Sequence, residues 1–84
     1  MKYRVEYSND ARKSLKSMSR ETSDLILNKI DGLAENPFTP NPNIKRLVGR
    51  PEFRLRVGDW CILYAIHHDA LYIEILKIGS RGGF

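Results

Sequence analysis

The sequence predicts an α+β domain in which two helices cover one face of a sheet. Three observations predict it. The first residues alternate between apolar and polar, the next segment carries apolar residues at helical spacing, and the C-terminal half returns to strand-like runs joined by short turns. With 84 residues, the chain is expected to form one domain, residues 1–84, near the lower size limit for a self-sufficient core.

The first strand and the first helix follow each other directly. Lys2–Tyr7 alternates in the period-two pattern of a strand with one buried face. One of the three polar residues at positions 8–10 can then cap a helix. Ala11, Leu15 and Met18 follow at helical spacing. They predict a short amphipathic helix that ends near Met18.

A second helix is predicted to begin at Ser19, which Glu21 follows in the first turn. Its apolar stripe consists of Leu25, Ile26, Ile30 and Leu33. The helix should end near Glu35–Asn36, because Pro37 disfavours helical geometry in the residue before it. Residues 36–43 hold three prolines and three asparagines, and they are predicted to form a connecting loop.

Three strands are expected to complete the chain, at Glu52–Val57, Trp60–Ile66 and Leu71–Ile78. The short turns between them favour an antiparallel meander. We expect this meander and the N-terminal strand to form one sheet, with both helices on one face and the other face free. The tail from Gly79 to Phe84 is expected to be flexible.

The charge of the chain is uneven. A formal net charge of +4 and a pI near 9.5 favour a polyanionic partner or an acidic protein. Residues 1–43 carry seven cations and six anions, whereas residues 44–84 carry seven cations and four anions. The C-terminal half is therefore the expected contact surface.

Much of this excess lies between Ile44 and Arg56. Five cations stand there against one acid, Glu52; they are Lys45, Arg46, Arg50, Arg54 and Arg56. Because Arg54 and Arg56 are two positions apart, they point to the same face of a strand, away from its apolar residues. If the apolar face packs under the helices, guanidinium groups line the free face, and such a face is suited to bind phosphate.

The lone cysteine, Cys61, excludes an internal disulfide and any zinc site with several cysteines. The sequence shows no signal peptide and no apolar run long enough to span a bilayer. We therefore expect a cytoplasmic protein that does not contact the membrane, and we expect no cofactor or metal.

The order of these motifs resembles the RelE/ParE superfamily of bacterial toxins from type II toxin–antitoxin pairs, over essentially the whole chain. Five motifs carry the resemblance. They are S-x-x-A-x-K-x-L at Ser8–Leu15, L-x-G at Leu47–Gly49, F-R-L-R-V-G-D-W at Phe53–Trp60, I-L-Y-x-I at Ile62–Ile66 and I-G-x-R at Ile78–Arg81. The resemblance implies the fold predicted above.

Two activities occur in this superfamily, and the fold alone does not choose between them. The RelE branch resembles ribosome-dependent endoribonucleases that cut mRNA by attack of the 2′-hydroxyl group. The ParE branch resembles DNA gyrase inhibitors without the ribonuclease residues. We expect the RelE-type activity, a metal-independent mRNA interferase that inhibits translation and growth. The alternatives are a ParE-like gyrase inhibitor, an attenuated member that acts mainly through antitoxin binding, and a plain RNA-binding domain.

The resemblance also implies site residues. Arg54, Arg56 and Arg81 stand where RelE-type enzymes carry catalytic cations. Nucleic-acid binding is expected from four further residues, which are Lys45, Arg46, Arg50 and Phe84. The chain departs from the pattern at Cys61, where many members have arginine, and at Phe84, where many ribonuclease-type members have a tyrosine.

Chemistry assigns roles within this set. Arginine is a poor base because its pKa lies above about 12, so the three arginines are expected to clamp the phosphate and stabilise transition-state charge. Cys61 has no fixed positive charge and is expected to be a half-buried strand residue. His67 and His68 are candidates for a general base, but we expect them to be exposed residues of a turn.

The resemblance implies several partners. A cognate antitoxin is expected to cover the basic groove, so that antitoxin and RNA use the same cations. The ribosome and mRNA are the other expected partners. The toxin–antitoxin complex is expected to be hetero-oligomeric and to bind operator DNA through the antitoxin.

Overall fold

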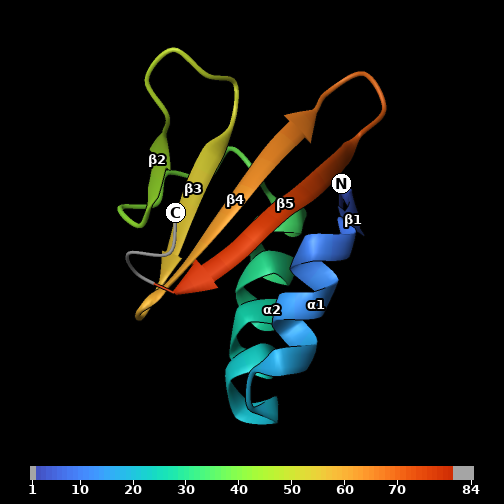
Figure 1. Cartoon of the computed structure of the whole chain (residues 1–84). Coiled ribbons are helices and arrows are strands. Elements are labelled where there is room, and N and C mark those ends of the chain that lie inside the picture. The colour runs from blue at the N-terminus through green and yellow to red at the C-terminus, as the bar shows by residue number, and fades with distance from the viewer. Residues whose placement is uncertain (1, 81–84) are drawn as a thin grey trace.

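The computed structural model describes residues 2–80, in which two helices form a layer against a five-stranded sheet (Figure 1). The elements in chain order are β1 (Arg4–Tyr7), α1 (Asn9–Ser17), α2 (Arg20–Glu35), β2 (Ile44–Arg46), β3 (Phe53–Val57), β4 (Trp60–His67) and β5 (Tyr72–Ser80). The predicted α+β class is confirmed. None of the helices in this range is long and apolar enough to cross a membrane.

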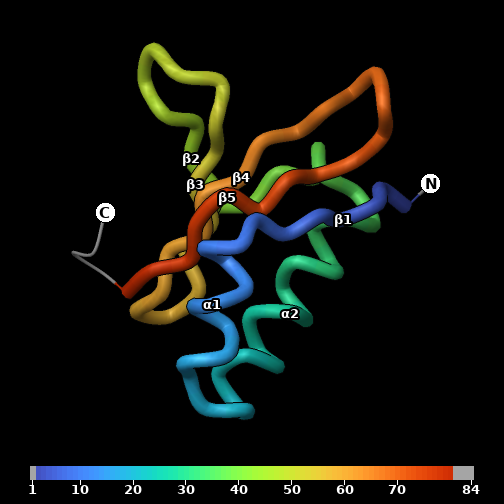
Figure 2. The backbone as a smooth tube through the Cα atoms, turned by 45° about the vertical axis from the view of Figure 1, so that its right-hand side comes forward, coloured from blue at the N-terminus to red at the C-terminus, as the bar shows by residue number. Residues whose placement is uncertain are grey.

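The strands lie in the order β1-β5-β4-β3-β2. The first strand is parallel to the last, and the other neighbours are antiparallel. Figure 2 shows β1 beside β5, with both helices on the same side of the sheet. The predicted meander is therefore present as β3, β4 and β5.

Two details differ from the sequence prediction. The loop does not run into β3 directly, because β2 pairs with β3 first, with Ile44 opposite Leu55. A three-residue strand is too short for alternation to show in the sequence. The last strand also continues to Ser80, since Gly79 and Ser80 pair with residues of β4. The prediction of a flexible tail is thus wrong for Gly79 and Ser80, which belong to the sheet.

Both helices are capped by serines: Ser8 is one of the three candidates that the sequence offers for the first helix, and Ser19 is the predicted start of the second. The hydroxyl oxygen of Ser8 accepts a hydrogen bond from the backbone N–H of Ala11 at 3.0 Å. The hydroxyl oxygen of Ser19 accepts one from the backbone N–H of Thr22 at 3.2 Å. Each satisfies a backbone donor that the first helical turn cannot pair. The second helix ends at Glu35, just before Asn36 and Pro37, as predicted.

The core lies between the helices and the sheet. The helices contribute Ala11, Ile26, Ile30, Leu33 and Ala34, and the strands contribute Leu55, Val57, Ile62, Tyr64, Ile73, Ile75 and Ile78. Tyr64 is fully buried at the centre of this cluster. Burial raises the pKa of its hydroxyl group to about 12, because the charged form loses its water.

A bulge interrupts the pairing of β4 with β5. Tyr64 lies opposite Ile75 and Leu63 lies opposite Lys77, so Leu76 has no partner residue on β4. An extra residue shifts the alternation of every residue after it. As a result Ile78 is buried and Lys77 is exposed.

Candidate nucleic-acid interface

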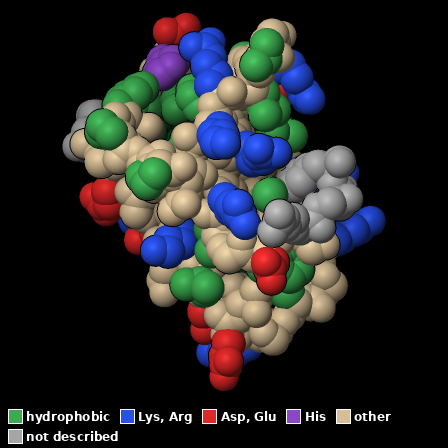
Figure 3. Space-filling model, turned by 90° about the vertical axis from the view of Figure 1, so that its left-hand side faces the viewer, with side chains coloured by type: hydrophobic (Ala, Val, Ile, Leu, Met, Phe, Trp, Pro, Cys, Tyr) green, Lys and Arg blue, Asp and Glu red, His purple; other side chains and the backbone are tan. Residues whose placement is uncertain are grey.

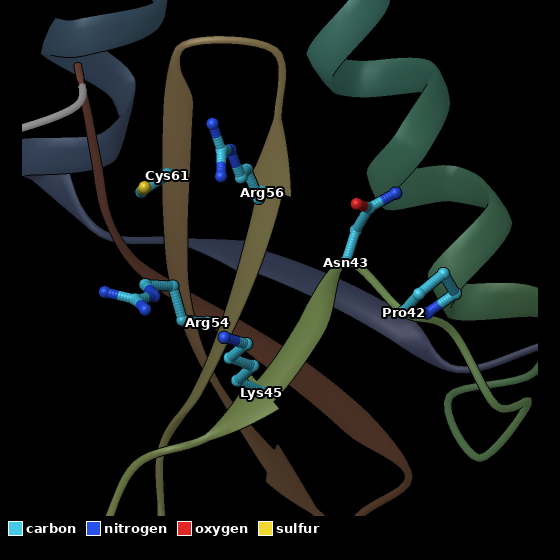
Figure 4. A pocket seen from close by; sticks show the side chains of 6 residues that line it. All are labelled: Pro42, Asn43, Lys45, Arg54, Arg56 and Cys61. Carbon is cyan, nitrogen blue, oxygen red and sulfur yellow. The ribbon is translucent and has the colours of Figure 1, made fainter.

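A cationic pocket opens on the sheet face that the helices leave uncovered. Its volume is about 270 Å³. It is lined by Pro42, Asn43, Lys45, Arg54, Arg56 and Cys61 (Figure 4). Lys45 is the cross-strand partner of Arg54, and Arg54 and Arg56 alternate along β3. Pairing and alternation therefore bring the three cations to one face.

The exposure of β3 agrees with the sequence prediction. Arg54 and Arg56 are exposed, whereas Leu55 and Val57 between and beside them are buried. The side view in Figure 3 shows Lys and Arg side chains gathered on the side of the molecule where β2 lies. Because no carboxylate of residues 2–80 lines the pocket, its three positive charges add to one another, which favours a phosphate group.

Two hydrogen bonds position Arg56, one from its backbone and one from its side chain. Its N–H donates a hydrogen bond to the Asn43 carbonyl at 2.9 Å. Its guanidinium Nε–H donates to the Gly58 carbonyl at 3.3 Å. Gly58 has a φ of +60°, a left-handed conformation that suits glycine in the tight turn between β3 and β4. The first contact fixes the backbone of Arg56, and the second fixes its guanidinium group, which lines the pocket.

The other predicted cations do not stay together. Lys45 lines the pocket, but its neighbour Arg46 has its guanidinium group 5.8 Å from the centre of the Phe53 ring. Arg50 forms an ion pair with Glu52, with 2.7 Å between its Nε and a carboxylate oxygen. Alternation along β2 places Lys45 and Arg46 on opposite faces, and the ion pair with Glu52 neutralises the charge of Arg50. Arg81 and Phe84, also predicted for this site, lie outside the described residues.

Cys61 lies within the pocket and faces both neighbouring strands. It is opposite Arg56 on β3 and opposite Gly79 on β5. The side chain is half-buried, as expected from the sequence. Glycine on one side leaves the thiol beside the cations without a bulky neighbour from β5. An arginine at this position would therefore share the face with Arg54 and Arg56.

Sequence reasoning missed two pocket residues, Pro42 and Asn43, and one further cation on the same face. The proline and asparagine belong to a loop whose path the sequence does not specify, although they directly precede β2. The cation is Lys77, opposite Leu63. Strict alternation from Ile73 and Ile75 would direct it into the core, so only the bulge reveals its place.

His67 is not a turn residue, which corrects the sequence prediction. It belongs to β4, where its Nε2 lies 3.0 Å from a carboxylate oxygen of Glu74. Its ring stacks on Tyr72 with 4.3 Å between ring centres, and the Arg4 guanidinium lies 5.0 Å from the same tyrosine ring. The half-exposed imidazole is thus held by two neighbours, Glu74 and Tyr72.

Position also separates His67 from the pocket. It stands four residues along β4 from Leu63, the partner of Arg54, which corresponds to about 13 Å. It therefore cannot take a proton beside a phosphate held by Arg54. His68 does lie in the turn, where its ring stacks on Phe38 with 5.3 Å between centres. Within residues 2–80, no three His, Cys, Asp or Glu side chains are grouped to hold a metal ion.

The fold and the cationic sheet face together point to a class, the small toxins of the RelE/ParE type. The chain is similar to a chain of the archaeal RelE–RelB complex from Pyrococcus horikoshii, with a TM-score of 0.84, 27% identity and 100% coverage of both chains. It shares the fold of a chain in the toxin–antitoxin complex RelBE2 from Mycobacterium tuberculosis. The TM-score is 0.79 at 21% identity, and the match covers 96% of this chain and 100% of the other chain.

The sequence comparisons agree with this class. Residues 5–83 match the family described as the ParE toxin of type II toxin–antitoxin system, parDE. The chain is also 33% identical to the RelE1 protein of Methanocaldococcus jannaschii over 85 aligned positions, which cover 99% of this chain and 94% of that protein. The chain belongs to the RelE/ParE superfamily of toxins from type II toxin–antitoxin systems.

Proposed function

We propose that this toxin is a ribosome-dependent, metal-independent endoribonuclease that cuts mRNA in the cytoplasm and so inhibits translation and growth. The observation that carries the proposal is the pocket in which Lys45, Arg54 and Arg56 converge, with no carboxylate among its described lining residues. Three adjacent cations match the charge of a phosphodiester that gains negative charge during cleavage. The family resemblance supplies the substrate class.

The proposed reaction is an internal transesterification. The 2′-oxygen attacks the adjacent phosphorus and gives its proton to water, a P–O2′ bond forms, and the P–O5′ bond breaks. The leaving 5′-oxygen takes up a proton, and the products end in a 2′,3′-cyclic phosphate and a 5′-hydroxyl. Arg54 and Arg56 stabilise the charge of the pentacovalent phosphorus, with Arg81 as the third proposed catalytic cation.

Binding of the substrate and of the ribosome is assigned to the remaining basic residues. Lys45 contacts the phosphate from β2, on the same face as Arg54. Arg46 and Arg50 lie towards the hairpin that joins β2 to β3, and we propose that they meet ribosomal RNA. Phe84 is proposed to stack on a base.

The test is cleavage of a reporter mRNA in a translating extract. Wild-type protein should cut the message only while it is being translated, and Arg56→Ala should lower the rate by about 10²-fold or more, the effect typical of losing one charge-stabilising group. Lys29→Ala is the matched control, since it removes one exposed cation from α2 that does not line the pocket. Uncut message with folded wild-type protein overturns the proposal.

A cognate antitoxin is the proposed protein partner. Two similar structures are toxin–antitoxin complexes, and the exposed cations of the open face suit an acidic antitoxin segment. We propose a hetero-oligomeric complex that binds operator DNA through the antitoxin. Co-expression with a small protein from a neighbouring reading frame, if that frame encodes the antitoxin, should yield a stable complex and abolish cleavage; free toxin after co-purification would contradict this.

Cys61 favours a second candidate function. A neutral thiol stands where many ribonuclease-type members carry arginine, and the matched family is described by its ParE member. A ParE-like toxin would inhibit DNA gyrase, and an attenuated member would act mainly through its antitoxin. Supercoiling by purified gyrase in the presence of this chain separates the classes: inhibition supports the ParE-like function, and full activity excludes it.

A further inference from the structure

We propose that Lys77 is a phosphate-contacting residue of the RNA site, in a row of cations that crosses four strands. This inference rests on the proposed function, because it concerns the same sheet face. It adds a residue from β5, whereas the pocket residues come from the loop before β2 and from β2, β3 and β4. It also implies that the bound RNA runs across the β-strands of the sheet.

The pairing of residues between neighbouring strands shows where this row of cations lies. Lys45 on β2 is opposite Arg54 on β3, Arg54 is opposite Leu63 on β4, and Leu63 is opposite Lys77 on β5. Side chains of directly opposed residues lie on the same face of a sheet. Neighbouring strands lie about 4.8 Å apart, so the row extends over about 14 Å from Lys45 to Lys77. Three cations and one leucine therefore form a line perpendicular to the strands.

The bulge is what brings Lys77 into this row. Ile73 and Ile75 are buried, so an uninterrupted strand would also turn residue 77 towards the helices and expose residue 78. Instead Leu76 is the extra residue, Ile78 is buried and Lys77 is exposed. An ammonium group in the core would be costly, and the bulge avoids that cost while it adds a cation to the open face.

The surface between the cations favours RNA over an acidic peptide. The open face of β4 carries three half-buried apolar residues, Cys61, Leu63 and Ala65, followed by His67 at the end of the strand. Cations flank Cys61 and Leu63, from β3 and, at Lys77, from β5, whereas Glu74 lies opposite Ala65 and pairs with His67. A nucleotide chain carries apolar base faces along with regularly spaced phosphates, and single strands bind where cations and apolar surface alternate.

The experiment measures binding of a single-stranded oligoribonucleotide with 2′-O-methyl groups, which the proposed chemistry cannot cut. Fluorescence anisotropy of the labelled oligonucleotide is recorded with the full protein chain over a range of salt concentrations. Each phosphate contact contributes about 0.7 to the slope of log K against log salt, so Lys77→Ala should lower the slope by about that amount and weaken binding several-fold at low salt. Lys77→Arg should retain most of the slope.

Lys29→Ala removes the same charge from the helix layer and should leave the slope unchanged. Equal losses in both alanine variants would mean a general charge effect and would overturn the inference. So would an unchanged slope for Lys77→Ala. Uncut message in the translating extract, with Lys77-dependent binding intact, would remove the proposed cleavage and leave this inference standing. Cleavage of the message, with no effect of Lys77→Ala on binding, would support the proposed cleavage and overturn this inference.

Discussion

The hydroxyl group of Ser8 donates a hydrogen bond to the backbone carbonyl of Leu76 at 2.7 Å, across 68 positions of sequence. The same oxygen accepts the N–H of Ala11 and so caps α1. Leu76 is the unpaired residue of the bulge in β5. One side chain therefore satisfies both the first turn of a helix and the carbonyl of the bulge that exposes Lys77.

Ser8→Ala should destabilise the protein more than loss of an ordinary cap. The cap is worth about 1 kcal/mol, and a part-buried carbonyl that loses its partner adds about 1 kcal/mol or more. We expect the free energy of unfolding in urea to fall by about 2–3 kcal/mol. Ser19→Ala is the matched control, because its hydroxyl caps α2 at an exposed site. Equal losses in both variants would contradict the double role of Ser8.

Stability should fall at high pH because Tyr64 is buried. Its pKa is about 12 in the folded chain and 10.0 is the ordinary value, so the unfolded chain loses this proton first. The stabilising contribution is complete below pH 10 and is lost as the pH rises towards 12. By linkage the loss is about 2–3 kcal/mol.

Tyr64→Phe should remove this pH dependence, since phenylalanine does not titrate. The measurement is urea unfolding of both proteins at neutral pH and at about pH 11, with their difference compared. Burial also raises the pKa of Tyr7, which gives the same sign, but Tyr7 is present in both proteins and its effect cancels. A constant difference between the two proteins across this range would refute the assignment to Tyr64.

Cys61→Arg should strengthen binding to RNA. The new guanidinium group would stand opposite Arg56, and the glycine on its other side leaves space for it. We expect a rise of about 0.7 in the salt slope with the 2′-O-methyl oligonucleotide. Repulsion between like charges on neighbouring strands should cost up to about 1 kcal/mol of stability. Cys61→Ala is the control and should leave the slope unchanged.

Growth arrest on induction of the same variants tests whether Cys61 attenuates the toxin. A large gain in toxicity for Cys61→Arg, with none for Cys61→Ala, would mean that the thiol limits activity. Equal toxicity of all three proteins would mean that this active site is organised without a cation at position 61.

Arg50→Ala and Arg56→Ala should differ although each removes one arginine. Arg50 is paired with Glu52 and lies outside the cationic pocket, so its loss should change oligonucleotide binding little. Arg56 lines the pocket, and its loss should lower the salt slope by about 0.7. The check is anisotropy of both variants under the same conditions. A larger effect from Arg50→Ala would move the binding surface to the β2–β3 hairpin.

Local patterns in the sequence determined most of the fold. The caps at Ser8 and Ser19, the end of α2 before Pro37 and the outward direction of Arg54 and Arg56 each depend on neighbours only a few positions away. Such short-range rules hold whatever the rest of the chain does. They were enough to predict the two helices, the meander and the basic sheet face.

Only the tertiary structure decided what depends on pairing between distant segments. The strand β2 exists because Ile44 meets Leu55, and His67 belongs to β4 because it pairs with Tyr72. Lys77 faces outwards because an extra residue in β5 shifts the register, which its own neighbours do not reveal. The physical reason is that register is a property of two strands together, so a one-residue shift in one of them reverses the face of every side chain that follows.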